Sequence, residues 1–233
     1  MFFDTRYLIF LLPALLLGLY AQARVKSAYG QYSRVRNARG LSGYEAASVL
    51  LRSAGLDHVK VQEVPGNLSD HYDPGKQVLS LSQGVARTPS VASLGIVAHE
   101  IGHAMQDATS YGPLRVRSGL VPMVQIGSWL GPIVFLAGYV LTAFTGSTAI
   151  AWLGVFLFAG TAVFSLVTLP VEFNASHRAL QLLQTYGVAD GQELQATKKV
   201  LDAAALTYVA AVVQSLGTLL YYVFLLTGFS RRR

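Results

Sequence analysis

The chain has 233 residues, of which 52% are hydrophobic and 13% charged, and it contains no cysteine. Soluble globular chains carry roughly 25% charged residues, so this composition argues against a soluble globular enzyme. It also excludes a disordered chain, which needs low hydrophobicity and high charge. The lack of cysteine excludes disulfides, a thiol nucleophile and thiolate metal sites, but leaves sites of histidine and carboxylate open. The net charge of +6 favours anionic lipid surfaces over nucleic acid as partners.

Four apolar blocks predict membrane-spanning helices. They are Tyr7–Tyr20, 120–144, 148–171 and about 203–229. The first is short for a span of about 20 residues and needs its flanks to be long enough. Only Thr145-Gly146-Ser147 separates the second from the third, so these two blocks predict a membrane hairpin. Gly127 and Gly131 have the small-xxx-small spacing that lets helices approach closely, although glycine is also ordinary in membrane helices.

The first block raises the question of a cleaved signal peptide. Ala21-Gln22-Ala23 resembles a signal-peptidase site after a short apolar stretch. The residues before the block include Asp4 and Arg6 and have no net positive charge, whereas a signal peptide needs one. The stretch that follows, 24–39, is strongly basic, and such charge resists translocation. We therefore expect an uncleaved membrane anchor.

Between the first two blocks, the polar segment 24–119 is of a size that can fold on the membrane surface. Ser42-Gly43-Tyr44-Glu45 fits a capping box and predicts the start of a helix. His58–Val64 and Gln77–Ser82 alternate in hydrophobicity and predict strands, with Asp73-Pro74-Gly75 as a turn between them. The segment is therefore expected to be a small α+β fold.

A helix predicted from Val91 to about Ala108, after Ser90, contains His99-Glu100-Ile101-Gly102-His103. Residues four apart lie on one helix face, so both imidazoles can reach one zinc ion. The glutamate between them can take a proton from water at the metal. The alternative without a metal is a pair of histidines that pack on a partly buried helix. We favour zinc, and we expect Gly102 to allow close backbone packing beneath the metal.

Two histidines leave a catalytic zinc ion one protein ligand short. Glu172 is the favoured third ligand, because it is the only acidic residue between Leu114 and Ala189 and stands where the third apolar block ends. A carboxylate there is costly without a partner. The hairpin returns it to the side of the membrane on which the histidine helix lies. The alternative without a metal is a solvated carboxylate near the membrane interface. The alternative third ligands are His177, His71, Asp73 and Asp107.

Other residues are candidates for supporting roles. A tetrahedral oxyanion needs a donor that stabilises it, and the candidates for this role or for contact with a ligand are His71, Tyr72, Ser176, His177 and Arg178. The alternating run Val78, Leu79, Ser80, Leu81 is either an edge strand that pairs with an extended substrate or a core strand.

The chain resembles the YugP-type membrane zinc metallopeptidases and is distantly similar to the HtpX and CaaX-protease class of integral-membrane gluzincins. The likeness is carried by LYAQ at 19–22, VKS at 25–27, GLSG at 40–43, DHYDP at 70–74, LSLS at 79–82, AHEIGHA at 98–104 and LPVEFNAS at 169–176. By this resemblance His99, His103 and Glu172 are zinc ligands and Glu100 is the general base. The larger class has an aspartate four residues after the ligand glutamate, where this chain has Ser176, so a carboxylate there is not expected.

We therefore expect a mainly α membrane protein with about four transmembrane helices and a small α+β, zincin-like catalytic segment. The expected organisation is an N-terminal anchor (1–23), a catalytic segment (24–119), a transmembrane hairpin (120–171), a third-ligand segment (172–202) and a C-terminal helix with a basic tail (203–233). The expected function is zinc-dependent hydrolysis of peptide bonds, with an endopeptidase favoured. The alternatives are a zinc-binding scaffold or chaperone-like protein without catalysis, which the intact Glu100 disfavours, and a transporter.

The expected cofactor is Zn²⁺, and the expected partners are a peptide or membrane-protein substrate and the lipid bilayer. No nucleic acid is expected, and homo-oligomerisation is left open. The expected location is the bacterial cytoplasmic membrane. The positive-inside rule favours a cytoplasmic active site, although Arg231-Arg232-Arg233 is a contrary signal. The basic residues on the histidine side are Arg24, Lys26, Arg34, Arg36, Arg39, Arg115, Arg117, Arg178, Lys198 and Lys199.

Overall fold

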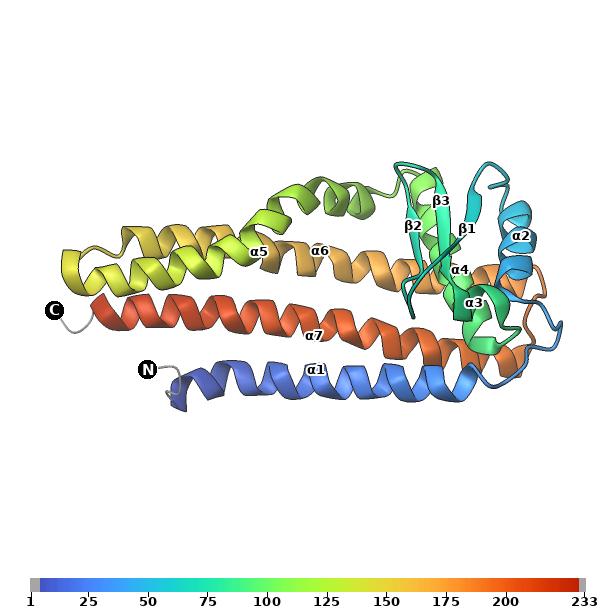
Figure 1. Ribbon diagram of the computed structural model, residues 1–233, viewed down its shortest axis with the longest axis horizontal. Coiled ribbons are helices and arrows are strands. Elements are labelled where there is room, and N and C mark those ends of the chain that lie inside the picture. Colours follow the sequence, from blue (N-terminus) through green and yellow to red (C-terminus); the bar gives the residue numbers. More distant parts are fainter. Residues whose placement is uncertain (1–4, 231–233) are drawn as a thin grey trace. The chain divides into compact units, whose positions relative to one another are not determined.

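The computed structural model describes residues 5–230, and four long helices account for most of them (Figure 1). They are α1 (Thr5–Tyr32), α5 (Gly112–Thr145), α6 (Ala149–Thr185) and α7 (Gly191–Ser230). Each contains a stretch long and apolar enough to cross a membrane. The prediction of a mainly α membrane protein with four spans is therefore confirmed. Asp4 and the triplet Arg231–Arg233 lie outside the described residues.

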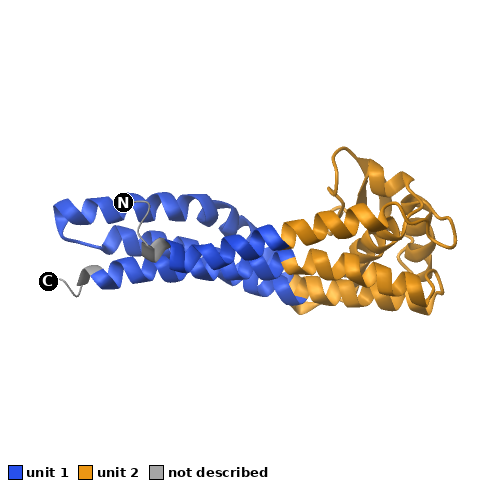
Figure 2. Cartoon of the chain, turned by 90° about the horizontal axis from the view of Figure 1, so that it is seen from below, with its two compact units in different colours: residues 1–20, 115–170, 207–233 blue, residues 21–114, 171–206 orange. Residues whose placement is uncertain are grey.

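The chain divides into two compact units, which have different colours in Figure 2. Unit 1 consists of 1–20, 115–170 and 207–233, and unit 2 consists of 21–114 and 171–206. Every long helix contributes to both units, because polar residues continue each helix beyond its apolar block. The histidine helix and Glu172 both belong to unit 2. The division of the sequence into five segments stays a prediction.

In unit 1, two glycines allow α5 and α6 to pack closely. A Cβ atom on Gly127 would lie 2.5 Å from the carbonyl oxygen of Leu157, and one on Gly131 would lie 2.9 Å from the main-chain nitrogen of Phe158. A larger residue would push these backbones apart. The small-xxx-small interpretation of Gly127 and Gly131 is therefore confirmed.

Unit 2 contains a three-stranded sheet and three further helices. The capping box at Ser42 is formed: its side chain accepts a hydrogen bond from the main chain of Glu45, whose carboxylate accepts one from the main chain of Ser42. The core of unit 2 contains fully buried leucine and isoleucine side chains from its short helices, from its sheet and from α6. The elements, in chain order, are α2 (Gly43–Ser53), β1 (Lys60–Val64), β2 (His71–Asp73), β3 (Val78–Ser82), α3 (Gln83–Arg87) and α4 (Val91–Ala108).

The sheet order is β1-β3-β2, which corrects one expectation. Strand β3 pairs in parallel with β1 and antiparallel with β2, so both of its edges are occupied. The interpretation of Val78, Leu79, Ser80 and Leu81 as an edge strand is wrong, and the core-strand alternative holds, since 79–81 are buried. Strand β2 was not predicted, because three residues are too few to display alternation.

Candidate metal centre

Helix α4 presents the two motif histidines on one face. It begins after Ser90, whose side chain accepts a hydrogen bond from a main-chain N–H of the first turn. Leu94 and Ile101 are buried in the core of unit 2, and this packing fixes the rotation of the helix about its axis. The rings of His99 and His103 then lie one turn apart, with centroids separated by 4.8 Å.

Helix α6 brings Glu172 to these histidines. Close packing of the two helices makes this possible, since a Cβ atom on Gly102 would lie 2.5 Å from the carbonyl oxygen of Ala175. The helices therefore meet backbone to backbone at this point, as expected for Gly102. The side chain of Glu172 is only 2% exposed, so its carboxylate is held inside the protein.

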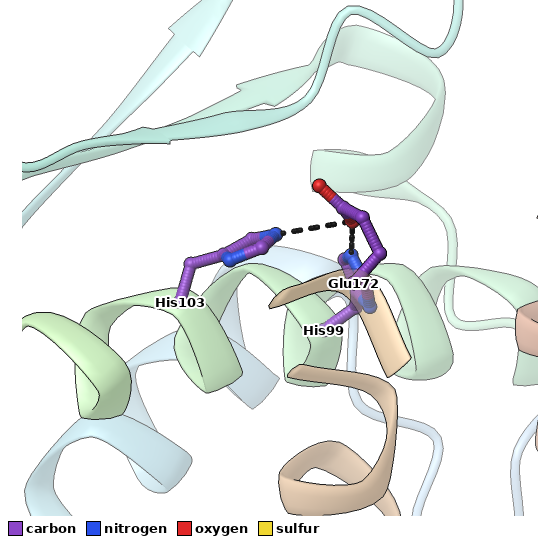
Figure 3. Close-up of side chains that lie close together, drawn as sticks. All are labelled: His99, His103 and Glu172. Carbon is purple, nitrogen blue, oxygen red and sulfur yellow. Dashed lines mark hydrogen bonds and ion pairs between the residues drawn. The ribbon is translucent and has the colours of Figure 1, made fainter. Parts of the chain in front are cut away.

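One carboxylate oxygen of Glu172 faces both imidazoles (Figure 3). Its Oε2 lies 3.1 Å from Nε2 of His99 and 3.4 Å from Nε2 of His103. The ligand atoms of the three residues all lie within 4.8 Å of one another. Among the residues that the structure describes, this is the group of histidines and carboxylates with the geometry to hold a metal ion.

The chemistry of this group fits zinc. Two histidine nitrogens and one glutamate oxygen form a donor set found at catalytic zinc sites, where a fourth position stays open. Zinc bonds of about 2.0–2.1 Å in a tetrahedron separate the ligand atoms by about 3.4 Å. The two nitrogen–oxygen distances, 3.1 and 3.4 Å, are close to that separation.

The electrostatics of the site favour positive charge. Burial by itself lowers the pKa of His103, because it disfavours the charged ring. The contact with Glu172 and the charge of Glu100 outweigh burial, so that the pKa of His103 lies above its ordinary value. The carboxylates of Glu172 and Glu100 therefore both favour positive charge at His103.

Each histidine has a neutral partner at its other ring nitrogen. His99 Nδ1 lies 3.2 Å from the hydroxyl of Ser176, and His103 Nδ1 lies 2.9 Å from the amide oxygen of Gln106. Partners of this kind orient a metal-binding histidine. The contact agrees with the expectation that Ser176 lies next to a ligand.

Glu100 is connected to strand β2. One of its carboxylate oxygens accepts a hydrogen bond from the main-chain N–H of Tyr72, at 3.0 Å. The phenol of Tyr72 donates a second hydrogen bond, of 2.9 Å, to Asp107, which lies on α4 like Glu100. Burial and this carboxylate raise the pKa of Tyr72 above its ordinary value. The Tyr72 hydroxyl is thus hydrogen-bonded to Asp107, which disfavours the expectation that it stabilises an oxyanion.

The remaining candidates lie outside the metal-binding group. His71 is exposed and its Nδ1 donates to the carbonyl oxygen of Ser69, while His177 is exposed as well. Asp73 accepts hydrogen bonds from main-chain N–H groups of its own turn. Arg178 donates to Asn174 and lies 5.9 Å from the ring of Tyr111. The structure therefore favours Glu172 over the alternative third ligands.

Comparison with known proteins gives the family. The sequence model described as "Putative neutral zinc metallopeptidase" matches residues 7–227. The chain belongs to this family. It is similar to the "Putative membrane protease YugP" of Bacillus subtilis (strain 168), with 43% identity over 212 residues that cover 91% of this chain and 92% of the relative. No solved structure matches the chain. The resemblance expected from the sequence motifs is confirmed.

Sequence reasoning missed two contacts of the site. Gln106 stands three positions after His103 and seven after His99, a helical spacing that places all three on one face, and this signal was available in the sequence. The main-chain N–H of Tyr72 at Glu100 had no such signal, because a backbone contact between distant segments leaves no residue pattern.

Proposed function

We propose that this membrane protein is a zinc-dependent endopeptidase that hydrolyses peptide bonds in peptides or membrane proteins. The observation that carries the proposal is the meeting of two Nε2 atoms and one buried carboxylate oxygen beside Glu100. The membership of a family of zinc metallopeptidases and the similarity to a membrane protease support it.

The roles follow from the positions of the side chains. His99, His103 and Glu172 would hold the metal ion. When bound, Zn²⁺ supplies a Lewis acid that polarises the scissile carbonyl and makes water nucleophilic near neutral pH. Glu100 accepts the proton of the attacking water and passes it to the leaving amine. The N–H of Tyr72 holds one oxygen of Glu100 in place, and the other oxygen takes the proton.

We place the active site on the cytoplasmic side of the cytoplasmic membrane. Each of the four long helices has one end in unit 2. Most of the basic residues of these helices lie at or next to those ends, and the positive-inside rule assigns such ends to the cytoplasm. Protease accessibility of unit 2 in sealed vesicles of known orientation tests the assignment. Digestion of unit 2 from the external face would reverse it.

The decisive experiment compares the purified full chain with its Glu100→Gln variant. The variant keeps the volume of the side chain but cannot take a proton, so we expect it to bind zinc and to lose hydrolysis by about 10²–10⁴-fold. The assays are zinc stoichiometry and the cleavage of casein and of a membrane-protein substrate. Glu63→Gln is the matched control, because Glu63 is a carboxylate paired with Arg87 on the surface of the same unit.

Each outcome separates the proposal from an alternative. Cleavage by Glu100→Gln at the rate of the unchanged chain would remove Glu100 from the role of base. Zinc binding without cleavage by the unchanged chain would instead favour the zinc-binding scaffold. Equal loss of activity in Glu63→Gln would mean that a general effect on folding explains the result.

A further inference from the structure

A buried glutamine connects the two helices that carry the candidate ligands. Gln106 is 0% exposed and lies on α4, close to one turn after His103. Its amide oxygen faces His103 Nδ1 at 2.9 Å, and its amide nitrogen donates to the carbonyl oxygen of Val171 at 2.8 Å and to Oδ1 of Asn174 at 3.0 Å. The amide therefore reaches from one ligand to the residue immediately before another, Glu172.

The partners of this amide determine which way it points. A carbonyl oxygen can only accept a hydrogen bond, so the group that faces Val171 must be the NH₂ of Gln106. Asn174 supports this orientation, because its own oxygen also accepts from Arg178, at 2.8 Å. The amide oxygen of Gln106 is then the atom directed at His103.

The same reasoning determines the tautomer of His103. An amide oxygen can only accept, so Nδ1 of His103 must carry the hydrogen. In the neutral ring the unprotonated nitrogen is then Nε2, which lies 3.4 Å from Glu172 Oε2. The main-chain carbonyl of Val171 thus sets, through Gln106, which nitrogen of His103 can bind a metal ion.

The partner of His99 at Nδ1 imposes no such constraint. Its Nδ1 faces the hydroxyl of Ser176 at 3.2 Å, and a hydroxyl can either donate or accept. The hydroxyl is compatible with both tautomers of His99, whereas the amide oxygen of Gln106 is compatible with only one tautomer of His103. The two histidines of the motif are therefore held by different means.

We propose that Gln106 is a positioning residue of the metal site, which fixes the tautomer of His103 and holds His103 in register with Glu172 on α6. The inference rests on the proposed function, since it assigns Gln106 a role toward the same metal ion. A buried amide with all its partners stabilises one arrangement, because any shift of α4 along α6 would leave a polar group without a partner.

Two variants of the full chain in detergent test the proposal. Gln106→Met has about the same length and no hydrogen-bonding amide. Gln106→Asn keeps the amide but is one methylene too short to join His103 to Val171. Thr197→Val is the control, because it removes a buried hydroxyl of unit 2 for which the described residues provide no hydrogen-bond partner. The measurements are zinc affinity by competition with a chelator, the visible spectrum of the Co²⁺ form, and the melting temperature without metal.

We expect both Gln106 variants to bind zinc about 10–100-fold more weakly and to change the Co²⁺ spectrum, as is typical when the partner of a ligand is lost. Thr197→Val should match the unchanged chain in zinc affinity and in the Co²⁺ spectrum. A lower melting temperature with unchanged zinc affinity and Co²⁺ spectrum would overturn the proposal, since Gln106 would then be merely structural. If Gln106→Met does not fold, Gln106→Asn decides by the same criteria. Failure of the unchanged chain to bind zinc would instead overturn the proposed function, and this inference with it.

Discussion

Replacement of Gly102 by alanine should disturb the metal site from beneath. The added Cβ atom would lie 2.5 Å from the carbonyl oxygen of Ala175, whereas ordinary contact begins at 3.4 Å. The backbones of α4 and α6 must therefore separate by about 0.9 Å, and Glu172 lies one turn before Ala175 on the helix that moves. Zinc sites tolerate deviations of only about 0.2 Å in their ligand distances.

The effect on stability should be smaller than the effect on metal binding. Overpacking costs about 1–3 kcal/mol. Replacement of glycine by alanine in a helix stabilises it by about 1 kcal/mol, so the net loss of stability is about 0–2 kcal/mol. We therefore expect Gly102→Ala to fold, and to bind zinc at least about tenfold more weakly because one ligand is displaced.

Gly95→Ala is the matched control on the same helix. Its Cβ atom would lie 2.9 Å from the side-chain methyl of Thr197 on α7, not against the backbone beside Glu172. Zinc affinity by chelator competition and thermal unfolding of both variants are the assays. Zinc affinity of Gly102→Ala equal to that of the unchanged chain would refute the reasoning, and so would an equal loss in Gly95→Ala.

Three further predictions test the site. Glu172→Gln keeps the volume but removes the anionic ligand, and we expect its zinc stoichiometry to fall, whereas retention of a full zinc equivalent would exclude Glu172 as a ligand. Tyr72→Phe keeps the N–H at Glu100 but loses the bond to Asp107, so we expect a loss of about 1–2 kcal/mol in the free energy of unfolding; a large loss of kcat at unchanged stability would show that the phenol contacts substrate. Removal of metal by a chelator should abolish hydrolysis and lower the melting temperature, with both restored by Zn²⁺; full activity of the metal-free chain would contradict the mechanism.

The sequence by itself determined the local features of this protein. The capping box at Ser42 and the helix Val91–Ala108 follow from short-range patterns, because a helix start needs only side chains within one turn. The four spans follow from apolar length, since a membrane admits few other structures. The spacing of His99 and His103 on one helix face likewise needs no tertiary contact.

The tertiary structure decided what depends on distant segments. It brought Glu172 rather than His71, His177, Asp73 or Asp107 to the two histidines, and the contact with His99 joins residues 73 positions apart. It placed β3 in the centre of the sheet, because alternation along a strand specifies its faces and says nothing about its edges. It also supplied the contacts of Gln106 with Val171 and Asn174 and the contact of the Tyr72 N–H with Glu100, because each of these joins segments that are distant in the sequence.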